Sequence, residues 1–268
     1  FRKTVKEANP DALILAEHYG DASDWLSGDQ WDTVMNYDAF MEPISWFLTG
    51  LEKHSERKDE HLLHNSQAFM CSMLSNMSRM QTGSLYAAMN ELSNHDHSRF
   101  LTRTNRVVGR LYKPEDAENA EKGINYGTFR SGALIQMTWP GAPTIYYGDE
   151  AGMEGFEDPL NRGTYPWGRE DRDLLAWFTR LGALRNAYPA LQSGTISWLY
   201  TAGPLLIFAR QNGDQRLTTA VNASPDSHTV TLLWEGAGPT DLLTGDTLPC
   251  SGGVLHLQLP PWGCRLLL

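Results

Sequence analysis

Ala12-Leu13-Ile14-Leu15-Ala16-Glu17-His18-Tyr19-Gly20 is the stretch of sequence that decides the fold. Its first five residues are apolar, and the run ends on a carboxylate. An unbroken apolar run of this length is typical of a strand buried on both faces, in a parallel sheet that helices cover. In a barrel of alternating strands and helices, catalytic groups lie at the carboxyl ends of the strands. Glu17 is therefore the first candidate for a catalytic residue.

Around this stretch, residues 1–188 alternate between helix-like and strand-like segments. The hydrophobic pattern predicts helices over 1–10, 40–51, 62–80, 115–139 and 174–188. It predicts strands over 12–17, 31–37, 85–93 and 144–147. Such alternation is typical of an α/β fold with a parallel sheet, in which helices connect successive strands.

The last part of the chain has a different pattern. Short strand-like runs cover 205–211, 217–222, 229–234, 241–243, 254–259 and 264–268. Asn212-Gly213-Asp214 and Gly245-Asp246 are typical of hairpin turns between them. We therefore predict two domains, an α/β domain over 1–190 and a small antiparallel β-sandwich over 191–268 that packs on the last helix.

Composition limits the classes of function. The 268 residues include 22 basic and 32 acidic ones, a net charge of −10, which argues against a nucleic-acid partner. No apolar run approaches the ~20 residues of a membrane-spanning helix. The three cysteines are too few and too scattered for a disulfide framework or a metal site. They favour a reducing compartment, and we expect a cytoplasmic protein, although a chain that begins on Phe1 constrains location only weakly.

Two candidate carboxylates follow different predicted strands. One is Glu17, and the other is Asp96, which lies between His95 and His97. Paired carboxylates across a cleft are the basic equipment of glycoside hydrolysis: one donates a proton to the leaving oxygen, and an ionised one faces the positive charge that develops at the sugar carbon. Spacing alone makes this a modest signal, because many proteins place a carboxylate at a strand end.

The residues around these carboxylates also resemble a known family. Three segments are similar to successive motifs of the α-amylase superfamily (glycoside hydrolase family 13): Ile14-Leu15-Ala16-Glu17, Asn94-His95-Asp96-x-x-Arg99 and Pro140-Gly141-x-Pro143-x-Ile145-Tyr146-Tyr147-Gly148-Asp149-Glu150. Two others resemble its neopullulanase, cyclomaltodextrinase and maltogenic amylase group: Asp29-Gln30-Trp31-Asp32-x-Val34-Met35-Asn36-Tyr37, and Asp158-Pro159-x-x-Arg162 followed by Trp167. The resemblance extends over about residues 1–192, with the motifs in order.

The resemblance implies a role for individual residues. Glu17 matches the general acid and base of the family, and Asp96 matches the carboxylate that grips sugar hydroxyls and stabilises the transition state. His95 matches the histidine that hydrogen-bonds the sugar at the cleavage site. Arg99 matches the arginine that ends this motif, as structural support near the site. Tyr19 occupies the position of an aromatic that stacks on the leaving-group sugar.

Two further residues are substrate-binding candidates. Arg162 lies in a loop expected over the mouth of the barrel, where it would contact distal sugars. Trp167 follows in the same loop, and an aromatic face suits the apolar face of a glucose ring. The resemblance implies no cofactor, and we predict no metal site.

One expected motif is missing. The nucleophile of the family is an Asp in a Gly-x-Arg-x-Asp motif on the strand before the one that bears Glu17, and this chain has no such motif. The resemblance therefore implies the C-terminal half of a (β/α)8 TIM barrel, strands 5–8, followed by the β-sandwich. A retaining mechanism needs a nucleophile, so the chain alone is expected to be inactive. Unpaired strand edges should also make it associate with itself or with the missing N-terminal half.

The expected activity is retaining hydrolysis of α-1,4-glucosidic bonds in cyclomaltodextrin, pullulan or maltooligosaccharides. Two alternatives remain open at the level of the sequence. One is a non-catalytic protein on the same fold that binds glucan or a partner. The other is an isomerising glucosyltransferase.

Overall fold

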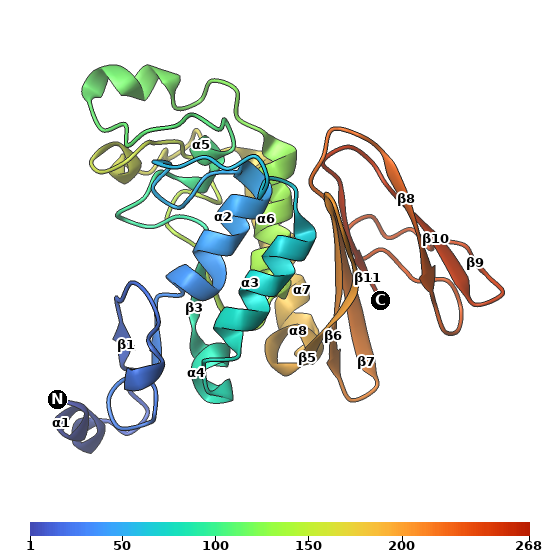
Figure 1. Cartoon of the computed structure of the whole chain (residues 1–268), viewed down its shortest axis with the longest axis horizontal. Coiled ribbons are helices and arrows are strands. Elements are labelled where there is room, and N and C mark those ends of the chain that lie inside the picture. The colour runs from blue at the N-terminus through green and yellow to red at the C-terminus, as the bar shows by residue number, and fades with distance from the viewer.

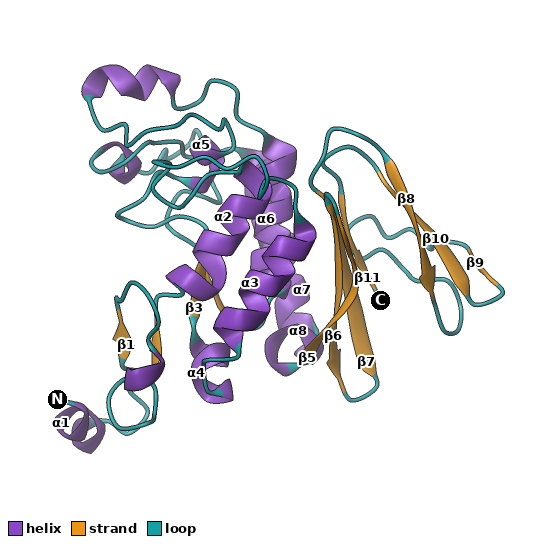
Figure 2. Ribbon diagram, in the orientation of Figure 1, coloured by secondary structure: helices purple, strands orange, loops and turns teal.

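The computed structural model describes residues 1–268, and Figures 1 and 2 show the arrangement of its elements. The helices are α1 (Arg2–Ala8), α2 (Glu42–Thr49), α3 (Ser66–Met77), α4 (Thr82–Ala87), α5 (Phe100–Arg103), α6 (Tyr126–Thr138), α7 (Arg172–Ala187) and α8 (Pro189–Ser193). The strands are β1 (Leu15–Ala16), β2 (Thr33–Val34), β3 (Met89–Glu91), β4 (Ala142–Thr144), β5 (Thr195–Ala202), β6 (Leu205–Asn212), β7 (Gln215–Asn222), β8 (His228–Leu233), β9 (Cys250–Ser251), β10 (Val254–Leu259) and β11 (Cys264–Leu267).

The first four strands are parallel and follow one another in chain order. β1 pairs with β2, and β3 pairs with β4. A parallel bridge between Met35 and Met89 joins the end of β2 to the start of β3. The helices α2, α3 and α4 lie between β2 and β3 in the chain, and α5 and α6 lie between β3 and β4. This is the order of neighbouring strands in a βα unit, in which every strand presents its carboxyl end to the same edge.

The strand that ends on Glu17 is shorter and more exposed than its sequence predicts. The expectation of a strand buried on both faces is wrong, because Leu13 is 58% exposed while Ile14 is buried. β1 has β2 as its single neighbour, so its other edge carries no strand. Asp32 fixes this strand instead, since its carboxylate accepts a hydrogen bond from Ile14 N at 2.8 Å.

Four other predicted segments differ from the structure. The predicted strand over 144–147 shares only Thr144 with β4, and the predicted strand over 241–243 is reduced to an isolated bridge at Asp241. The predicted strand over 85–93 is only Met89–Glu91, because Thr82–Ala87 forms α4. The predicted helix over 115–139 is α6 alone, preceded by a separate 3-10 turn over Pro114–Asn119. α6 begins where Asn125 caps it by accepting a hydrogen bond from Thr128 N, which satisfies a free N–H group of the first turn.

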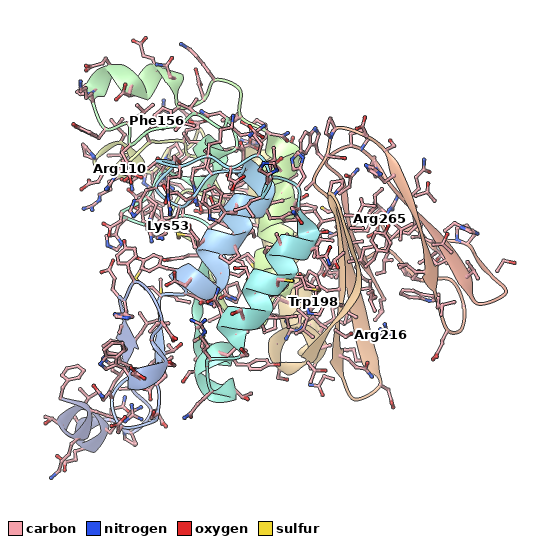
Figure 3. All side chains as sticks on the ribbon, in the orientation of Figure 1. Lys53, Arg110, Phe156, Trp198, Arg216 and Arg265 are labelled. Carbon is pink, nitrogen blue, oxygen red and sulfur yellow. The ribbon has the colours of Figure 1, made fainter.

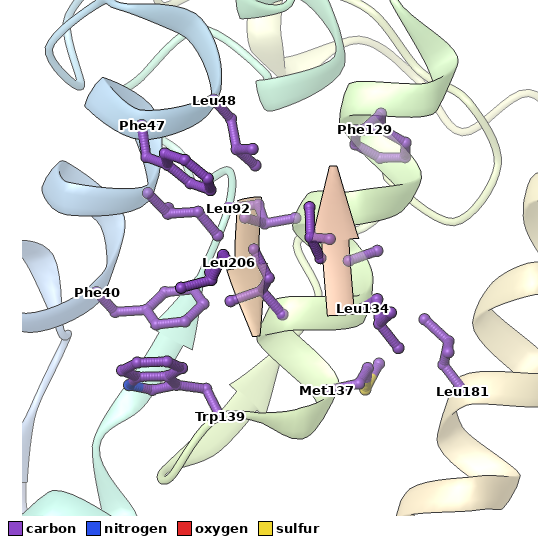
Figure 4. Close-up of a cluster of buried hydrophobic side chains, with 14 of the residues drawn as sticks. Phe40, Phe47, Leu48, Leu92, Phe129, Leu134, Met137, Trp139, Leu181 and Leu206 are labelled. Carbon is purple, nitrogen blue, oxygen red and sulfur yellow. The ribbon is translucent and has the colours of Figure 1, made fainter. Parts of the chain in front are cut away.

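A large hydrophobic core joins the helices to the first β-sheet of the C-terminal region. Figure 4 shows part of it, with aromatic and aliphatic side chains from several helices around Leu206 of β6. Trp198 of β5 lies against the same core, with its ring 5.5 Å from that of Trp139 and 6.5 Å from that of Phe69 (Figure 3). The helical region and this sheet are therefore packed as one body.

The C-terminal region is built from two antiparallel sheets, as the sequence predicts. Their strand orders are β11-β7-β6-β5 and β8-β10-β9. A second core lies between them, and it includes Ile207 and Ala220 from the first sheet and Val230, Leu255 and Leu257 from the second. The predicted alternation along β10 is confirmed, because its Leu side chains at 255, 257 and 259 are buried while 256 and 258 are exposed.

Candidate active site

Three predicted residues meet at one exposed edge of the parallel strands. Glu17 directly follows β1, and His95 and Asp96 lie in the loop after β3. His95 Nε2 is 3.2 Å from Glu17 Oε1 and 3.4 Å from Asp96 Oδ1. The side chains of all three are between one third and one half exposed, so a ligand in solution can reach them. The structure therefore brings both predicted carboxylates to the same face, with the imidazole between them.

Tyr19 and Arg162 complete the exposed face of this cluster. The Tyr19 hydroxyl donates to Asp96 Oδ2 at 3.3 Å. Arg162 Nε donates to the main-chain oxygen of His95 at 3.0 Å, and its Nη2 lies 3.8 Å from Asp96 Oδ1. Partial burial and the neighbouring carboxylates raise the pKa of Tyr19 to about 12, so its hydroxyl stays a hydrogen-bond donor at neutral pH.

Arg99 lies below this face and is fully buried. Its Nε donates to the main-chain oxygen of Asn161, and its Nη1 donates to Asp149 Oδ1 at 3.1 Å. Asn161 in turn donates its amide hydrogens to the main-chain oxygens of residues 94, 95 and 97. Arg99 thus supports the loop that carries His95 and Asp96, and it has no surface through which to contact a sugar.

Trp167 lies apart from the cluster. Its side chain is 81% exposed, and its ring packs on that of Tyr165 at 4.5 Å. It makes no ring contact or hydrogen bond with Glu17, His95 or Asp96. Its place in sugar binding therefore stays a prediction.

Sequence reasoning missed two residues that hold Glu17 in place. The Tyr37 hydroxyl donates to Glu17 Oε1 at 3.1 Å, and its ring stacks on that of Tyr19 with centroids 4.5 Å apart. Asn94 Nδ2 donates to the Tyr37 hydroxyl at 3.2 Å. Both residues stand inside motifs that the sequence marks out. Tyr37 also begins a π-helical turn, Tyr37–Met41, a feature found often at functional sites.

Three buried groups behind the cluster are held in their neutral forms. Burial raises the pKa of Glu91 to about 8. The hydrogen bond from Asn94 opposes this rise, and the nearby Glu17 charge adds to it. Burial also raises the pKa of Tyr37. Burial lowers the pKa of His97, and the neighbouring His54 and Arg103 add to the effect. Glu91, Tyr37 and His97 are therefore uncharged at neutral pH, while the front of the site presents two carboxyl groups to solvent.

The cluster has the parts that acid–base chemistry at a sugar requires. Two carboxyl groups leave different strands and face the same solvent region, and the hydroxyl groups of Tyr37 and Tyr19 donate to them. Glu17, His95 and Asp96 are also close enough to share one metal ion, since one ligand atom from each lies within 4.8 Å of the others. Their contacts with one another and with Tyr19 and Tyr37 also suit a ligand with many hydroxyl groups.

Comparison with known proteins gives the family. Residues 1–169 match the model of the α-amylase catalytic domain. The chain belongs to the α-amylase family. Residues 200–266 match the maltogenic amylase C-terminal domain. The resemblance that the motifs predicted is thus confirmed, as is the C-terminal β region.

Relatives with named activities are similar along nearly the whole chain. Neopullulanase 2 from Thermoactinomyces vulgaris is 35% identical over 274 residues, which are 100% of this chain and 42% of that protein. An amylopullulanase from Thermoanaerobacter thermohydrosulfuricus is 32% identical over 281 residues, 97% of this chain and 18% of that protein. These relatives are named glycoside hydrolases of the family, and the chain spans less than half the length of either.

Solved structures give the same result for the fold. A debranching enzyme from Nostoc punctiforme, soaked with acarbose, matches with a TM-score of 0.78 and 27% identity over 99% of this chain and 52% of its own. A cyclomaltodextrinase matches with a TM-score of 0.79 and 26% identity over 100% of this chain and 42% of its own.

No helix of the chain is both long enough and apolar enough to cross a membrane.

Proposed function

We propose that this chain is the part of a retaining α-glucan hydrolase that carries the proton donor Glu17 and the charged carboxylate Asp96. The bond cleaved is α-1,4-glucosidic, in cyclomaltodextrin, pullulan or maltooligosaccharides. Relatives named neopullulanase and cyclomaltodextrinase support the first two substrates. The observation that carries the proposal is the contact of His95 with both carboxylates, from two strand ends, on one exposed face.

Each residue has a role that its position supports. Glu17 protonates the leaving oxygen and then activates water, because an exposed carboxyl group can reach both the glycosidic oxygen and solvent. Asp96, held by Tyr19, faces the developing charge at the sugar carbon. His95 hydrogen-bonds the sugar between them. Arg162 and Trp167 are proposed to bind more distant sugars, and Arg99 supports the loop from below.

The nucleophile of a retaining mechanism is not among these residues. A carboxylate oxygen of Asp96 lies within 4.8 Å of one of Glu17, but the resemblance assigns Asp96 to the sugar hydroxyls and the transition state. The nucleophile would be a further carboxylate, about 5 Å from Glu17, in the Gly-x-Arg-x-Asp motif that this chain does not contain. We therefore propose that the four parallel strands are strands 5–8 of a (β/α)8 barrel, with a domain boundary near residues 190 and 191, inside α8 (Pro189–Ser193). The consecutive order of β1 to β4 supports this assignment. Because the nucleophile is not in this chain, the chain alone is proposed not to turn over substrate.

The test is Glu17→Gln in the full-length protein that contains this chain. Removing the proton donor should lower kcat on cyclomaltodextrin by at least about 10²-fold, within the range of general acid–base catalysis. Glu7→Gln is the control, because Glu7 is an exposed carboxylate on α1 whose partner is Lys3. Full activity in Glu17→Gln would overturn the proposal. A wild-type protein that binds glucan without turning it over would favour the non-catalytic alternative, and conversion of maltose to an isomer would favour the glucosyltransferase.

A further inference from the structure

Glu91 is a buried carboxyl group behind the site that none of the proposed steps uses. It is the last residue of β3 and is 2% exposed. A buried carboxyl group costs free energy unless it is hydrogen-bonded or kept neutral, so its presence beside the proposed proton donor needs a reason.

A line of hydrogen bonds connects Glu91 to Glu17. Asn94 Nδ2 donates one hydrogen to Glu91 Oε1 at 3.0 Å and lies 3.2 Å from the Tyr37 hydroxyl, to which it donates the other. Because the Tyr37 oxygen accepts from Asn94, its own hydrogen is free to point at Glu17 Oε1, 3.1 Å away. The side chains of Glu91, Asn94 and Tyr37 thus form a chain of hydrogen bonds that ends on Glu17.

The contacts of the Asn94 amide oxygen fix the orientation of the amide group, and with it the direction of these hydrogen bonds. Asn94 Oδ1 accepts from the main-chain N–H groups of Asp96 and His97, at 2.9 and 3.1 Å. His97 Nδ1 lies 2.6 Å from the same oxygen. With donors on this side, the amide oxygen must face the loop and the amide nitrogen must face Glu91 and Tyr37.

These contacts also distinguish the two oxygens of Glu17. Oε1 receives the Tyr37 hydrogen bond and lies 3.2 Å from His95 Nε2. No side chain of the cluster contacts Oε2. A proton on Glu17 is therefore best placed on Oε2, which is the oxygen left to meet a glycosidic bond.

We propose that Glu91 is a positioning residue that, through Asn94 and Tyr37, holds the Tyr37 hydrogen bond on Glu17 Oε1 and so keeps Oε2 as the proton-donating oxygen. The inference rests on the proposed function, because it concerns how Glu17 serves as the proton donor. Glu91 itself does not reach substrate, and it acts only through the two residues between.

The charges around Glu91 give the arrangement a dependence on pH. Three charged groups face Glu91: Glu17 at the end of β1, Asp149 in the turn after β4 and Arg103 in α5. Asn94, in the loop after β3, is its hydrogen-bond partner. Burial raises the pKa of Glu91 to about 8, so it is neutral at pH 7 and ionises in weakly alkaline solution. The Glu17 charge opposes loss of the proton from Glu91, because two nearby carboxylates resist ionising together.

The first experiment observes the carboxyl groups of this chain directly, without activity. Glutamate 13Cδ signals are followed by NMR against pH, with Glu17→Gln and Glu91→Gln used for assignment. The Glu17 signal should show a small second inflection near pH 8, when Glu91 ionises. Glu91→Gln is the neutral isostere, since its amide oxygen still accepts from Asn94. It should abolish that inflection and leave the rest of the Glu17 curve unchanged.

Two further variants break the line of hydrogen bonds itself. Glu91→Leu removes the acceptor that holds Asn94, and Tyr37→Phe removes the hydrogen bond to Glu17. Both should move the Glu17 titration curve toward higher pH, because a carboxylate that loses a donor is less stable in its charged form. Identical Glu17 curves in wild type, Glu91→Leu and Tyr37→Phe would overturn the proposal.

The same variants in the full-length protein give the kinetic consequence. Glu91→Leu and Tyr37→Phe should each lower kcat by about 5- to 10-fold, the loss of one hydrogen bond, with KM nearly unchanged. Glu52→Gln is the matched control, a buried carboxyl group that accepts from the N–H groups of His54 and Glu56. It should lower the melting temperature without changing the pH profile. A Glu91→Leu protein that behaves in the same way as this control would show a merely structural role and overturn the inference.

The two tests separate the inference from the proposed function. If Glu17→Gln retains full activity but the NMR curves respond as described, the proposed function fails and the coupling of Glu91 to Glu17 stands as a fact about the fold. If Glu17→Gln is inactive and the curves do not respond, the function stands and the inference fails.

Discussion

His95 Nε2 lies 3.2 Å from Glu17 Oε1, although the two residues leave different strands of the parallel sheet. The same nitrogen is 3.4 Å from Asp96 Oδ1. A single imidazole therefore contacts both of the carboxyl groups that the proposed chemistry needs.

Removal of this imidazole should impair catalysis more than folding. We expect His95→Ala in the full-length protein to lower kcat/KM on cyclomaltodextrin about 10- to 100-fold, the value of a hydrogen bond to a charged group. The melting temperature should change little, because the side chain is 42% exposed. His256→Ala is the control, since His256 lies on an exposed face of β10 and contacts Thr231. Equal loss of activity in both variants would contradict the role of His95.

Asn161 gives a second prediction, concerning the loop after β3. Its buried amide donates to three main-chain oxygens of that loop, at 2.9 to 3.2 Å. Asn161→Leu leaves those oxygens without a donor, and we expect hydrogen exchange in residues 94–97 to rise and kcat/KM to fall about tenfold or more. Asn119→Leu is the control, because the exposed Asn119 side chain accepts only from the Lys122 ammonium group. Unchanged exchange in Asn161→Leu would contradict this account.

The sequence predicted the exposed carboxylates of the site better than the buried residues behind them. Glu17 and Asp96 could be found because each follows a predicted strand and stands in a motif of fixed spacing. Tyr37 also ends such a motif, but neither its role nor that of Glu91 could be predicted, because these roles depend on which side chains meet across β1, β2 and β3. Glu91 in particular stood within a predicted strand, where a single acidic residue carries no signal of its contacts.

The errors in predicted secondary structure have physical causes of the same kind. The run from residue 12 is apolar enough for a buried strand, but burial on both faces depends on neighbours, and β1 has one. The predicted helix over 115–139 ignored Gly123 and the capping Asn125, where the chain begins a new helix. The alternation along β10 was predicted correctly, because the period of two arises within the strand itself.

The buried pair of Arg99 and Asp149 gives a prediction about stability. Arg99 Nη1 lies 3.1 Å from Asp149 Oδ1, and neither side chain is more than 3% exposed. Arg99→Met leaves a buried carboxylate without its partner, and we expect it to lower the free energy of unfolding by about 3–5 kcal/mol in urea titrations. Arg99→Met combined with Asp149→Asn should recover part of this loss. A double variant less stable than the single one would contradict the pairing.

His64 gives a dependence of stability on pH. Burial lowers the pKa of His64 to about 4, and the Arg106 charge adds to the effect. The unfolded chain binds a proton near pH 6.5, whereas the folded chain does so only near pH 4, so this residue favours the folded state above pH 6.5 and that contribution is lost as the pH falls from 6.5 to 4. His64→Asn removes the proton site and tolerates the positive φ of 56°.

The measurement is the urea midpoint at pH 7 and pH 5. The midpoint of the wild type should fall more between these values than that of His64→Asn. His61→Asn is the control, because His61 is exposed. If His64→Asn and the wild type lose the same stability, another group is responsible for the acid sensitivity.

The exposed edge of the parallel strands leads to the last prediction. β1 and β4 each pair on one side only, and Leu13, Ile145 and Tyr147 beside them are 58%, 40% and 40% exposed. Open strand edges with apolar side chains pair with other chains, so we expect this chain to self-associate in sedimentation velocity, with a larger species that grows with concentration. Leu13→Lys should weaken the association, while Leu74→Lys, at a 44% exposed position on α3, should not. A single monomeric boundary at every concentration would contradict it, and association equally weakened by both variants would place the contact elsewhere.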